Sequence, residues 1–330
     1  MGANSAISWT THTFNPWWGC VEVAPECDNC YARDWANGLA GKPGLWGPPG
    51  EAQRLLMGDA YWKQLPKWQR AAAAAGERHR VFVASMSDIL EGKRPQGLPY
   101  IDDLNEPQLL TIDHVLQNAR ERLWAQVDEC PDLDFLLLTK RPQNYLHMVP
   151  ESWLQRWDSW PSNVWPGTTV GLQSSAWKLD HLVKVPAWIK WVSAEPLLGP
   201  LDLTPWLHCC PSCGSPRAEG MGGCYYCANI PEVNGLAWII AGGESGGPDE
   251  RRLVSRGRML DGLTPWPEHA PVLKDGWVPT TDALDTVRSL RDQAQAANVA
   301  FHFKQWGGPK PTSGGRLLDG RTWDEVPTLR

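Results

Sequence analysis

Three cysteines near the start of the chain have the type and spacing of an iron–sulfur or zinc site. They are Cys20, Cys27 and Cys30, in the order C-x6-C-x2-C. Thiolates are soft ligands that suit both metals, and a cubane cluster normally takes four of them. With three, one iron stays open to a molecule that carries an amino and a carboxylate group, as S-adenosylmethionine (SAM) does. The alternatives are plain thiols or a zinc knuckle completed by a distant ligand such as His12.

Polar side chains at the ends of the apolar runs are candidates for binding SAM and a substrate. The cofactor-binding candidates are Ser85, Asp88, Gln173, Ser174 and Glu195. Lys140 and Arg141 could pair with a carboxylate or a phosphate. Glu244 follows two glycines and could act as a base, so Lys140 and Glu244 are the catalytic candidates. The alternative for each residue alone is a solvated or capping polar group.

A second set of cysteines has the spacing of a zinc ribbon. Two C-x2-C pairs, separated by ten residues, are formed by Cys210, Cys213, Cys224 and Cys227. So short a loop cannot build a core, and four thiolates on Zn²⁺ would fold it. Cys209 is spare and could replace Cys210. The competing interpretation is an auxiliary iron–sulfur cluster.

Short apolar runs alternate with helical stretches along the chain, and these elements must position the cysteines. The runs cover residues 7–14, 80–88, 134–142, 168–173, 190–196, 238–245 and 300–307. Helices are expected at 51–75, 107–127 and 283–297, the last two from apolar residues at helical spacing. Continuously apolar strands are typical of a parallel sheet covered on both faces. The pattern predicts an α/β fold, a full or partial parallel (β/α) barrel rather than a doubly wound sheet.

The three-cysteine loop directly follows the first predicted strand. In parallel barrels, chemistry lies on the loops at the C-terminal ends of the strands. We expect barrel segments at 1–206 and 231–307, a zinc-ribbon-like insertion at 207–230 and an extended tail at 308–330. Residues 246–280 lack periodicity and are expected to form a lid or an irregular cap.

The composition is that of a soluble globular protein, with 42% hydrophobic and 21% charged residues. A net charge of −6 argues against a protein coated in nucleic acid but leaves room for a local basic patch. No apolar run approaches the roughly 18 residues that span a membrane, and the N-terminal residues lack the pattern of a signal peptide. We therefore expect a cytoplasmic protein without a membrane partner.

Several segments resemble those of a known family. They are T-F-N-P-W-W-G-C, C-D-N-C-Y-A, S-M-S-D at 85–88, L-L-T-K-R-P at 137–142, A-G-G-E-S-G at 241–246 and F-K-Q-W-G at 303–307. Together they look like the three-Cys-motif proteins found mainly in phages and prophages, which in turn resemble radical-SAM enzymes. The segments are spread over residues 9–307 and so cover most of the chain. The first cysteine gap is longer than in the usual radical-SAM spacing, C-x3-C-x2-C.

The resemblance implies a barrel of radical-SAM type, a 4Fe–4S cluster that cleaves SAM, and an electron donor. Typical radical-SAM enzymes place a Gly-Gly-Glu segment, which holds the SAM amino group, where this chain has S-M-S-D. Asp88 is therefore the candidate for that role. The phage setting implies a nucleic-acid base or nucleotide as substrate, as in DNA hypermodification, and the host cytoplasm as location. Basic residues compatible with phosphate are Lys140, Arg141, Arg251, Arg252, Arg256 and Arg258.

Two functions follow from these patterns. The first is a radical-SAM enzyme that modifies a nucleic-acid base or nucleotide, with the cofactor supplying the difficult chemistry. The second is a non-enzymatic protein that holds zinc in both cysteine sets and acts with a partner protein. A brown anaerobic preparation supports the first, and a colourless, zinc-loaded one supports the second.

Overall fold

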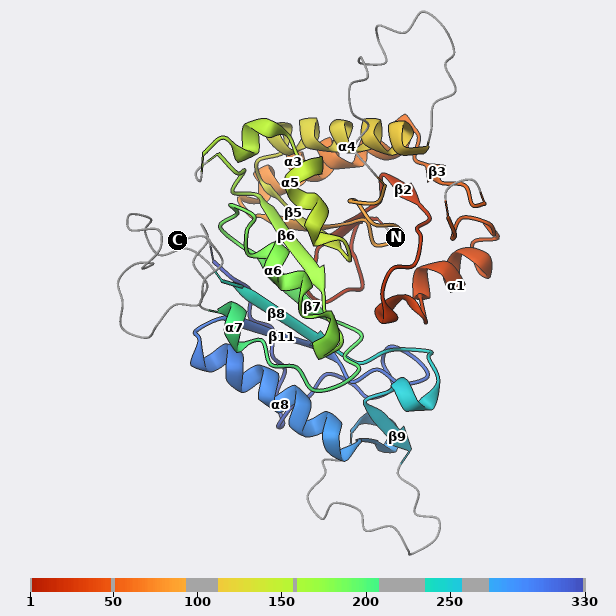
Figure 1. Ribbon diagram of the computed structural model, residues 1–330, viewed down its shortest axis with the longest axis vertical. Helices are drawn as coiled ribbons and strands as arrows, with labels where there is room; N and C mark the ends of the chain where they lie inside the picture. Colours follow the sequence, from red (N-terminus) through yellow and green to blue (C-terminus); the bar gives the residue numbers. More distant parts are fainter. Residues whose placement is uncertain are drawn as a thin grey trace, which may run out of the picture. The chain divides into compact units, whose positions relative to one another are not determined.

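The computed structural model describes residues 2–48, 51–92, 112–156, 159–207, 235–256 and 273–328 (Figure 1). Its main sheet has seven strands, and the α/β, partial-barrel fold class expected from the sequence is confirmed. The strands are β1 (His12–Phe14), β4 (His79–Val83), β5 (Leu133–Thr139), β6 (Val164–Thr169), β7 (Trp191–Ala194), β8 (Trp238–Gly242) and β11 (Ala300–Gln305). Every residue of β1, β6, β7 and β8 is buried, as expected for strands covered on both faces.

The chain forms two compact units, which are described separately. The first comprises Met1–Val23 and Ala32–Trp165, and the second comprises Ala24–Tyr31 and Pro166–Arg330. In the first unit, β4 pairs in parallel with both β1 and β5. In the second, parallel pairs join β6 to β7, β7 to β8 and β8 to β11. Within each unit, the C-terminal ends of neighbouring parallel strands therefore meet at one edge.

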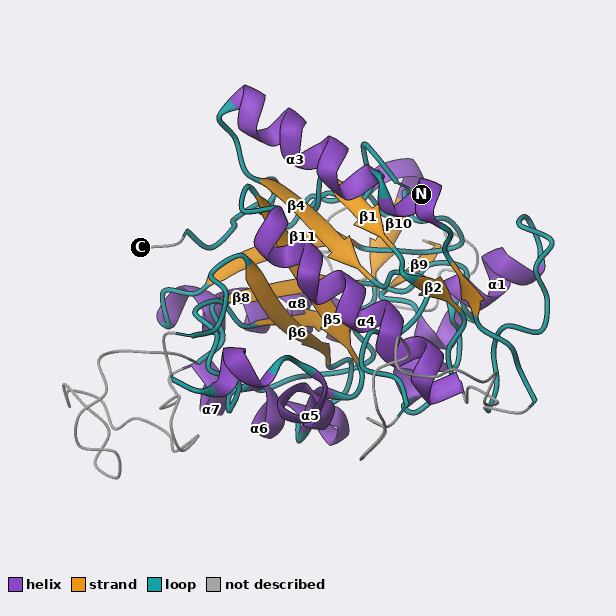
Figure 2. Ribbon diagram, turned by 90° about the horizontal axis from the view of Figure 1, so that it is seen from above, coloured by secondary structure: helices purple, strands orange, loops and turns teal. Residues whose placement is uncertain are grey.

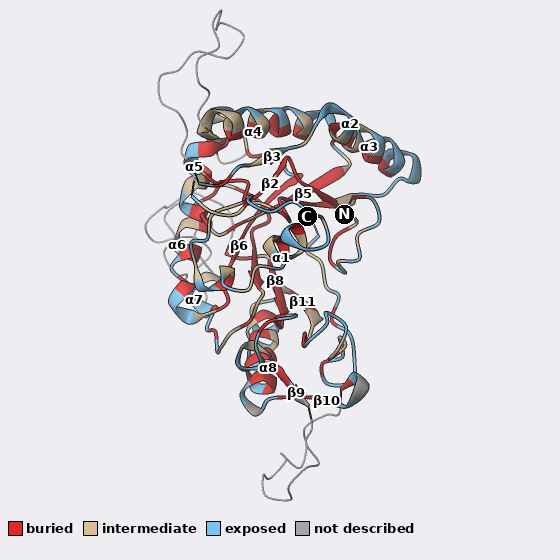
Figure 3. Cartoon of the chain, turned by 90° about the vertical axis from the view of Figure 1, so that its right-hand side faces the viewer, coloured by how far each residue is buried: buried red, intermediate tan, exposed pale blue. Residues whose placement is uncertain are grey.

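Helices separate most of the strands, and Figure 2 shows them in purple beside the orange sheet. The α-helices are α1 (Tyr31–Asn37), α2 (Asp59–Trp62), α3 (Gln64–Ala75), α4 (Ile112–Glu129), α5 (Tyr145–Met148), α6 (Lys178–Leu182), α7 (Thr204–Leu207) and α8 (Thr281–Ala296). The long helices bury a single face, visible as the red stripe on α4 and α8 in Figure 3. In α8 that face includes Val287, Leu290 and Ala294, which confirms the spacing expected at 283–297.

Some expected elements are shorter than the sequence indicated. The first run forms a strand only over His12–Phe14, because residues 7–10 make a turn closed by the Thr10 amide on the Ile7 carbonyl. The run at 134–142 ends as a strand at Thr139, so Lys140 and Arg141 lie in the turn that follows. The segment expected to be irregular contains an antiparallel pair, β9 (Val254–Arg256) with β10 (Trp277–Pro279). A second small pair joins β2 (Trp17–Trp18) to β3 (Leu55–Leu56).

The segment expected to be an extended tail lies along β11. The Phe303 amide donates to the Trp323 carbonyl (2.9 Å), and the Glu325 amide donates to the Phe301 carbonyl. An antiparallel bridge between His302 and Asp324 continues this pairing. The segment thus supplies hydrogen-bond partners to a strand at the end of the sheet order. No helix in the described part of the chain is long and apolar enough to cross a membrane.

Candidate metal and cofactor site

Backbone contacts on both sides hold Cys20 in place within the first unit. The Gly19 amide donates to the Met86 carbonyl, and the Gly47 amide donates to the Cys20 carbonyl, both at 3.0 Å. Gly19 has φ +103°, and a Cβ there would lie 2.3 Å from the Leu45 carbonyl oxygen. A residue with a side chain cannot occupy this position without shifting the backbone. The glycine before the cysteine in W-W-G-C is therefore required by the close packing of the loop around Gly47.

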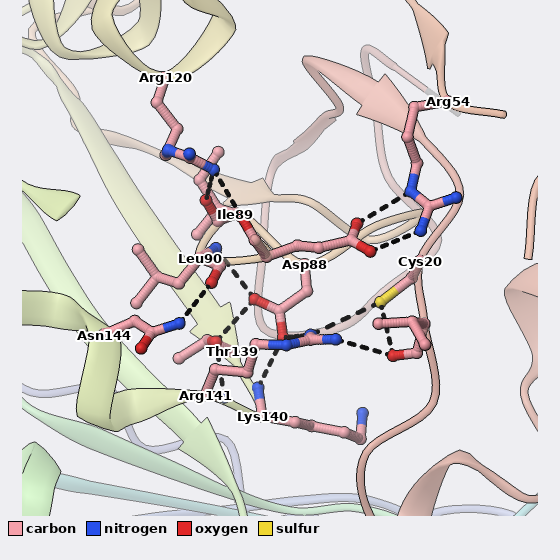
Figure 4. A network of polar contacts seen from close by, with 12 residues as sticks. Cys20, Arg54, Asp88, Ile89, Leu90, Arg120, Thr139, Lys140, Arg141 and Asn144 are labelled. Atoms are coloured by element: carbon pink, nitrogen blue, oxygen red, sulfur yellow. Dashed lines mark hydrogen bonds and ion pairs between the residues drawn. The ribbon is translucent and has the colours of Figure 1, made fainter. Parts of the chain in front are cut away.

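The Cys20 thiol faces a guanidinium group (Figure 4). Nη1 of Arg141 lies 3.7 Å from Sγ, and Nη2 donates to the neighbouring Val21 carbonyl at 2.8 Å. Burial raises the pKa of the Cys20 thiol to about 12, while the charge of Arg141 acts in the opposite direction. Arginine next to a thiol favours the thiolate, which is the form that binds metal.

Asp88 accepts hydrogen bonds at all the positions that its carboxylate offers. Oδ1 receives the Thr139 hydroxyl (2.6 Å) and the Leu90 amide (3.0 Å). Oδ2 receives Nη1 of Arg141 (2.7 Å) and the Lys140 amide (3.0 Å). Burial would raise the pKa of Asp88, but Arg141 and these donors hold it below its usual value. The structure thus gives the residue expected to bind the SAM amino group an internal role as the partner of Arg141.

Ser85 is also buried and engaged within the protein. Its hydroxyl contacts the side chain of Asn15, 3.1 Å from Nδ2, and Oδ1 of Asn15 accepts the Met86 amide at 2.7 Å. Asn15 therefore fixes the turn after β4, where Ala84 has a positive φ of 64°. Asn15 is not among the residues expected at the site, and its only signal in the sequence is its place in the T-F-N-P segment.

Two further arginines brace the same turn. Arg54 and Glu91 form an ion pair in which both side chains are almost fully buried, with 2.6 Å between Nη2 and Oε1. Arg120, also fully buried, donates to the carbonyls of Ile89 and Glu91. Charged donors thus bind the Asp88 and Glu91 carboxylates and the carbonyls of Ile89 and Glu91, which holds the turn that carries Asp88 in place. These partners were missed from the sequence, where they lie 29 to 37 positions apart.

Lys140 differs from its neighbour Arg141. It is half-buried, and no hydrogen bond or ion pair to its ammonium group is found among the described residues. In Figure 4 its side chain runs away from the Asp88 network, although its own amide belongs to that network. Of the cations singled out at the end of β5, Lys140 is thus the one able to bind an external anion.

In the second unit, Cys27 and Cys30 lie on a loop (residues 24–31) anchored by Glu26. Cys27 ends the short helix Pro25–Cys27. The buried Glu26 carboxylate accepts the Gly171 amide at 2.9 Å, and its other oxygen lies 3.1 Å from Nζ of the buried Lys178. Burial would raise the pKa of Glu26, but Gly171, Lys178 and Ser175 hold it below its usual value. The anchor ties the loop to the turn after β6.

A second anchor joins the same loop to the turn after β8. Arg251 binds Glu244 through two contacts, at 2.7 and 3.0 Å. Its Nη1 also reaches Asp28 at 3.2 Å, and its Nη2 reaches the Pro25 carbonyl at the same distance. Glu244, the expected base, is therefore buried in a bidentate ion pair. Its observed contacts position the cysteine loop.

The three remaining expected cofactor-binding residues, Gln173, Ser174 and Glu195, have no contact with one another among the hydrogen bonds and ion pairs of the described chain. Gln173 exchanges hydrogen bonds with the backbone of Asp202, and Ser174 is exposed. Glu195 pairs with Lys304, and both side chains are partly accessible. A Cβ on Gly242 would approach Oε1 of Glu195 to 3.2 Å, so glycine leaves room for this carboxylate. Lys304 belongs to the segment F-K-Q-W-G, and its partner lies 109 positions away.

The first set of predicted metal ligands lies within the described residues, and the second set lies outside them. The thiols of Cys20, Cys27 and Cys30 are free and half-buried, and Cys130 is free and buried. Within the described ranges, no three or more His, Cys, Asp or Glu side chains are gathered in the arrangement of a metal site. The ring of His12 lies 3.1 Å from that of His79 and stacks on Trp68. The four expected zinc ligands lie outside the described residues: Cys210, Cys213, Cys224 and Cys227. Cys209 and Arg258 lie outside them as well.

Comparison with known families gives one match, to the family described as "Protein of unknown function (DUF5131)". It covers residues 4–107, 104–256 and 282–327, which is most of the chain. The chain belongs to this family. No curated protein matches the sequence.

Solved structures of spore photoproduct lyase are similar in fold. A double mutant with bound AdoMet and dinucleoside spore photoproduct has 12% identity and a TM-score of 0.44 over 90% of this chain and 75% of the other. A complex with dinucleoside spore photoproduct has 11% identity and a TM-score of 0.46 over 92% and 78%.

Proposed function

We propose that this protein is a radical-SAM enzyme that holds a 4Fe–4S cluster on Cys20, Cys27 and Cys30. Its substrate is a nucleic-acid base or a nucleotide, and a one-electron donor reduces the cluster. The cluster, when bound, supplies an open iron for SAM and the electron that cleaves it. The observation that carries the proposal is a set of three free thiols at C-x6-C-x2-C spacing, one of which faces a guanidinium group.

The donor set fits such a cluster. Three thiolates are the ligands that iron–sulfur clusters take, and each of the three cysteines is half-buried and unbridged. Arg141 places a positive charge 3.7 Å from the Cys20 sulfur, where a thiolate brings a negative one. The anchors on Glu26 and Asp28 fix the backbone around the other two cysteines. Ligand loops held in this way need little reorganisation when they bind metal.

In this proposal, other residues bind SAM or the substrate and are not ligands of the cluster. Lys140, with no partner for its ammonium group in the described chain, is available to the carboxylate of SAM or to a phosphate of the substrate. The partly accessible pair of Glu195 and Lys304 offers an acceptor and a donor at the ends of β7 and β11. The nucleotide substrate is supported by the family resemblance of the motifs and by the free cation at Lys140.

The second cysteine set belongs to the same proposal. Cys210, Cys213, Cys224 and Cys227 hold one Zn²⁺ that folds the insertion at 207–230. The barrel segments at 1–206 and 231–307 flank this insertion. Metal analysis separates zinc from an auxiliary cluster, because the latter adds iron and sulfide in place of zinc.

Anaerobic reconstitution with iron and sulfide tests the proposal. The loaded protein is expected to be brown and to release 5′-deoxyadenosine from SAM when a reductant is added. Cys27→Ala should remove the iron and the SAM cleavage together, because thiolate ligation holds the cluster. Cys130→Ala is the matched control, since this buried cysteine lies outside the loop, and it should keep both.

Each alternative gives a distinct result. A colourless wild-type protein that takes up zinc and no iron would show that the chain is a zinc protein. Iron that survives the combined replacement of Cys20, Cys27 and Cys30 by alanine would show that other residues bind it. Release of 5′-deoxyadenosine only in the presence of a nucleotide or DNA would identify the substrate class.

A further inference from the structure

Arg141 is held by three different groups around its guanidinium. Nη1 lies 2.7 Å from the Asp88 carboxylate and 3.7 Å from the Cys20 sulfur, and Nη2 donates to the Val21 carbonyl at 2.8 Å. Both charged side chains of the ion pair are more than nine-tenths buried. Figure 4 shows the guanidinium lying between the carboxylate and the sulfur. Arg141 is thus committed to the cysteine loop and unavailable to a substrate anion.

Asp88 orients Arg141 and has no capacity left for another ligand. Its remaining hydrogen bonds come from the Thr139 hydroxyl and from the amides of Leu90 and Lys140. The guanidinium stays charged because arginine is not deprotonated in proteins. A carboxylate that orients a donor toward a metal ligand is a recurring arrangement around metal sites.

We propose that Arg141, oriented by Asp88, is a positioning residue that raises the reduction potential of the cluster held by Cys20. This inference rests on the proposed function. A hydrogen bond to a ligating sulfur stabilises the reduced cluster, because reduction adds negative charge near the donor. The buried setting strengthens the effect, since few water molecules are present to screen it. The negative charge of Asp88 lowers the reduction potential of the cluster and so offsets part of the increase that Arg141 causes.

Two single substitutions should move the potential in opposite directions. In Arg141→Lys, a point charge replaces the planar fork and cannot reach Asp88, Val21 and the sulfur together. The reduced fraction at a fixed potential should fall about tenfold, which corresponds to about 59 mV for one electron. In Asp88→Asn, the guanidinium loses its neutralising partner, so the reduced fraction should rise. A purely structural role for the pair would shift both variants the same way or not at all.

Two additional variants distinguish a change in reduction potential from a general loss of folding. The double variant Asp88→Asn/Arg141→Gln removes both buried charges at once, so neither is left unpaired. It should bind iron and show a lower potential than the wild type, because the contact to sulfur is lost. Arg80→Lys is the matched control, since Arg80 is a half-buried arginine of the same unit that donates to the Trp9 carbonyl rather than to the sulfur or to the turn of Asp88. It should keep the wild-type potential.

The measurement is a redox titration of the reconstituted cluster, followed by electron paramagnetic resonance in the absence of SAM. Iron and sulfide contents are determined first. A wild-type protein without iron overturns the proposed function and this inference together. A loaded Arg141→Lys protein with the wild-type potential overturns only the inference, as does a shift of both single variants in the same direction.

Discussion

The two loops that carry the cysteines are held by different means. Around Cys20, the charged group contacts the sulfur itself, and the backbone is fixed by the close approach of Gly19 to Leu45. In the loop at 24–31, the carboxylates of Glu26 and Asp28, on either side of Cys27, are anchored. No hydrogen bond to the sulfur of Cys27 or Cys30 is found within the described residues. The first arrangement acts on the electronic state of a ligand, and the second acts only on its position.

The difference predicts which substitutions affect stability and which affect chemistry. Glu26 and Lys178 are fully buried, so breaking this pair leaves a charge without compensation. The Asp28 end of the other anchor is exposed, and such contacts contribute little to stability. The loop at 24–31 should therefore depend mainly on Glu26 for its position.

The largest effect is expected for Lys178→Met. The variant leaves the Glu26 carboxylate buried with the Gly171 amide as its main donor, which should lower the free energy of unfolding by about 3–5 kcal/mol. Denaturant unfolding measures this loss, and the double variant Glu26→Gln/Lys178→Met should recover most of it. Asp249→Asn, which removes the exposed partner of Arg252, is the control and should cost less than about 1 kcal/mol. If Lys178→Met lowers the free energy of unfolding by no more than the control does, the loop does not rely on this anchor.

Gly19→Ala should have the next largest effect, on the other loop. The positive φ alone costs about 1–3 kcal/mol for a residue with a side chain, and the new Cβ would meet the Leu45 carbonyl. Unfolding free energy and iron uptake should both fall, because Cys20 is displaced. Gly41→Ala shares the positive φ but has open space around its Cβ, so it should cost less and leave iron uptake unchanged. Equal losses in the two variants would mean that the close packing beside Cys20 is unimportant.

The smallest expected effect is on the free energy of unfolding at acidic pH. The pKa of Glu26 is lower in the folded protein than its ordinary value of 4.5, so its contribution to stability is complete above that pH. That contribution is lost as the pH falls through the folded pKa, by at most about 1.4 kcal/mol per pH unit for one proton. Unfolding free energies measured below pH 4.5 should therefore fall less steeply in the Glu26→Gln/Lys178→Met variant. Parallel curves for variant and wild type would assign the acid sensitivity to other carboxylates.

The alternation of apolar runs and helical stretches was sufficient to predict the α/β fold. The run W-I-I-A-G at 238–242 is continuous and fully buried, and its position as a strand is confirmed. The boundaries were less accurate, because turns such as the one at 7–10 depend on hydrogen bonds rather than on hydrophobic periodicity.

The partners at the candidate site could not be predicted from local sequence. Asp88 and Arg141 stand 53 positions apart, and Glu26 and Lys178 stand 152 apart. The type and spacing of a residue indicate that it can bind a ligand, but only the fold shows whether its groups are already occupied. Asp88 and Glu244 have the right chemistry for the roles expected of them, and both carboxylates are taken up by arginines.

The pairing of residues 323–325 with β11 has a consequence for synthesis. Because a chain is made from its N-terminus, the outer edge of β11 has no partner until Trp323 and Glu325 have been added. During that interval the free amides and carbonyls of β11 are open to pairing with another chain, as any exposed strand edge is. Pairing with residues 323–325 covers these groups and so removes an exposed strand edge.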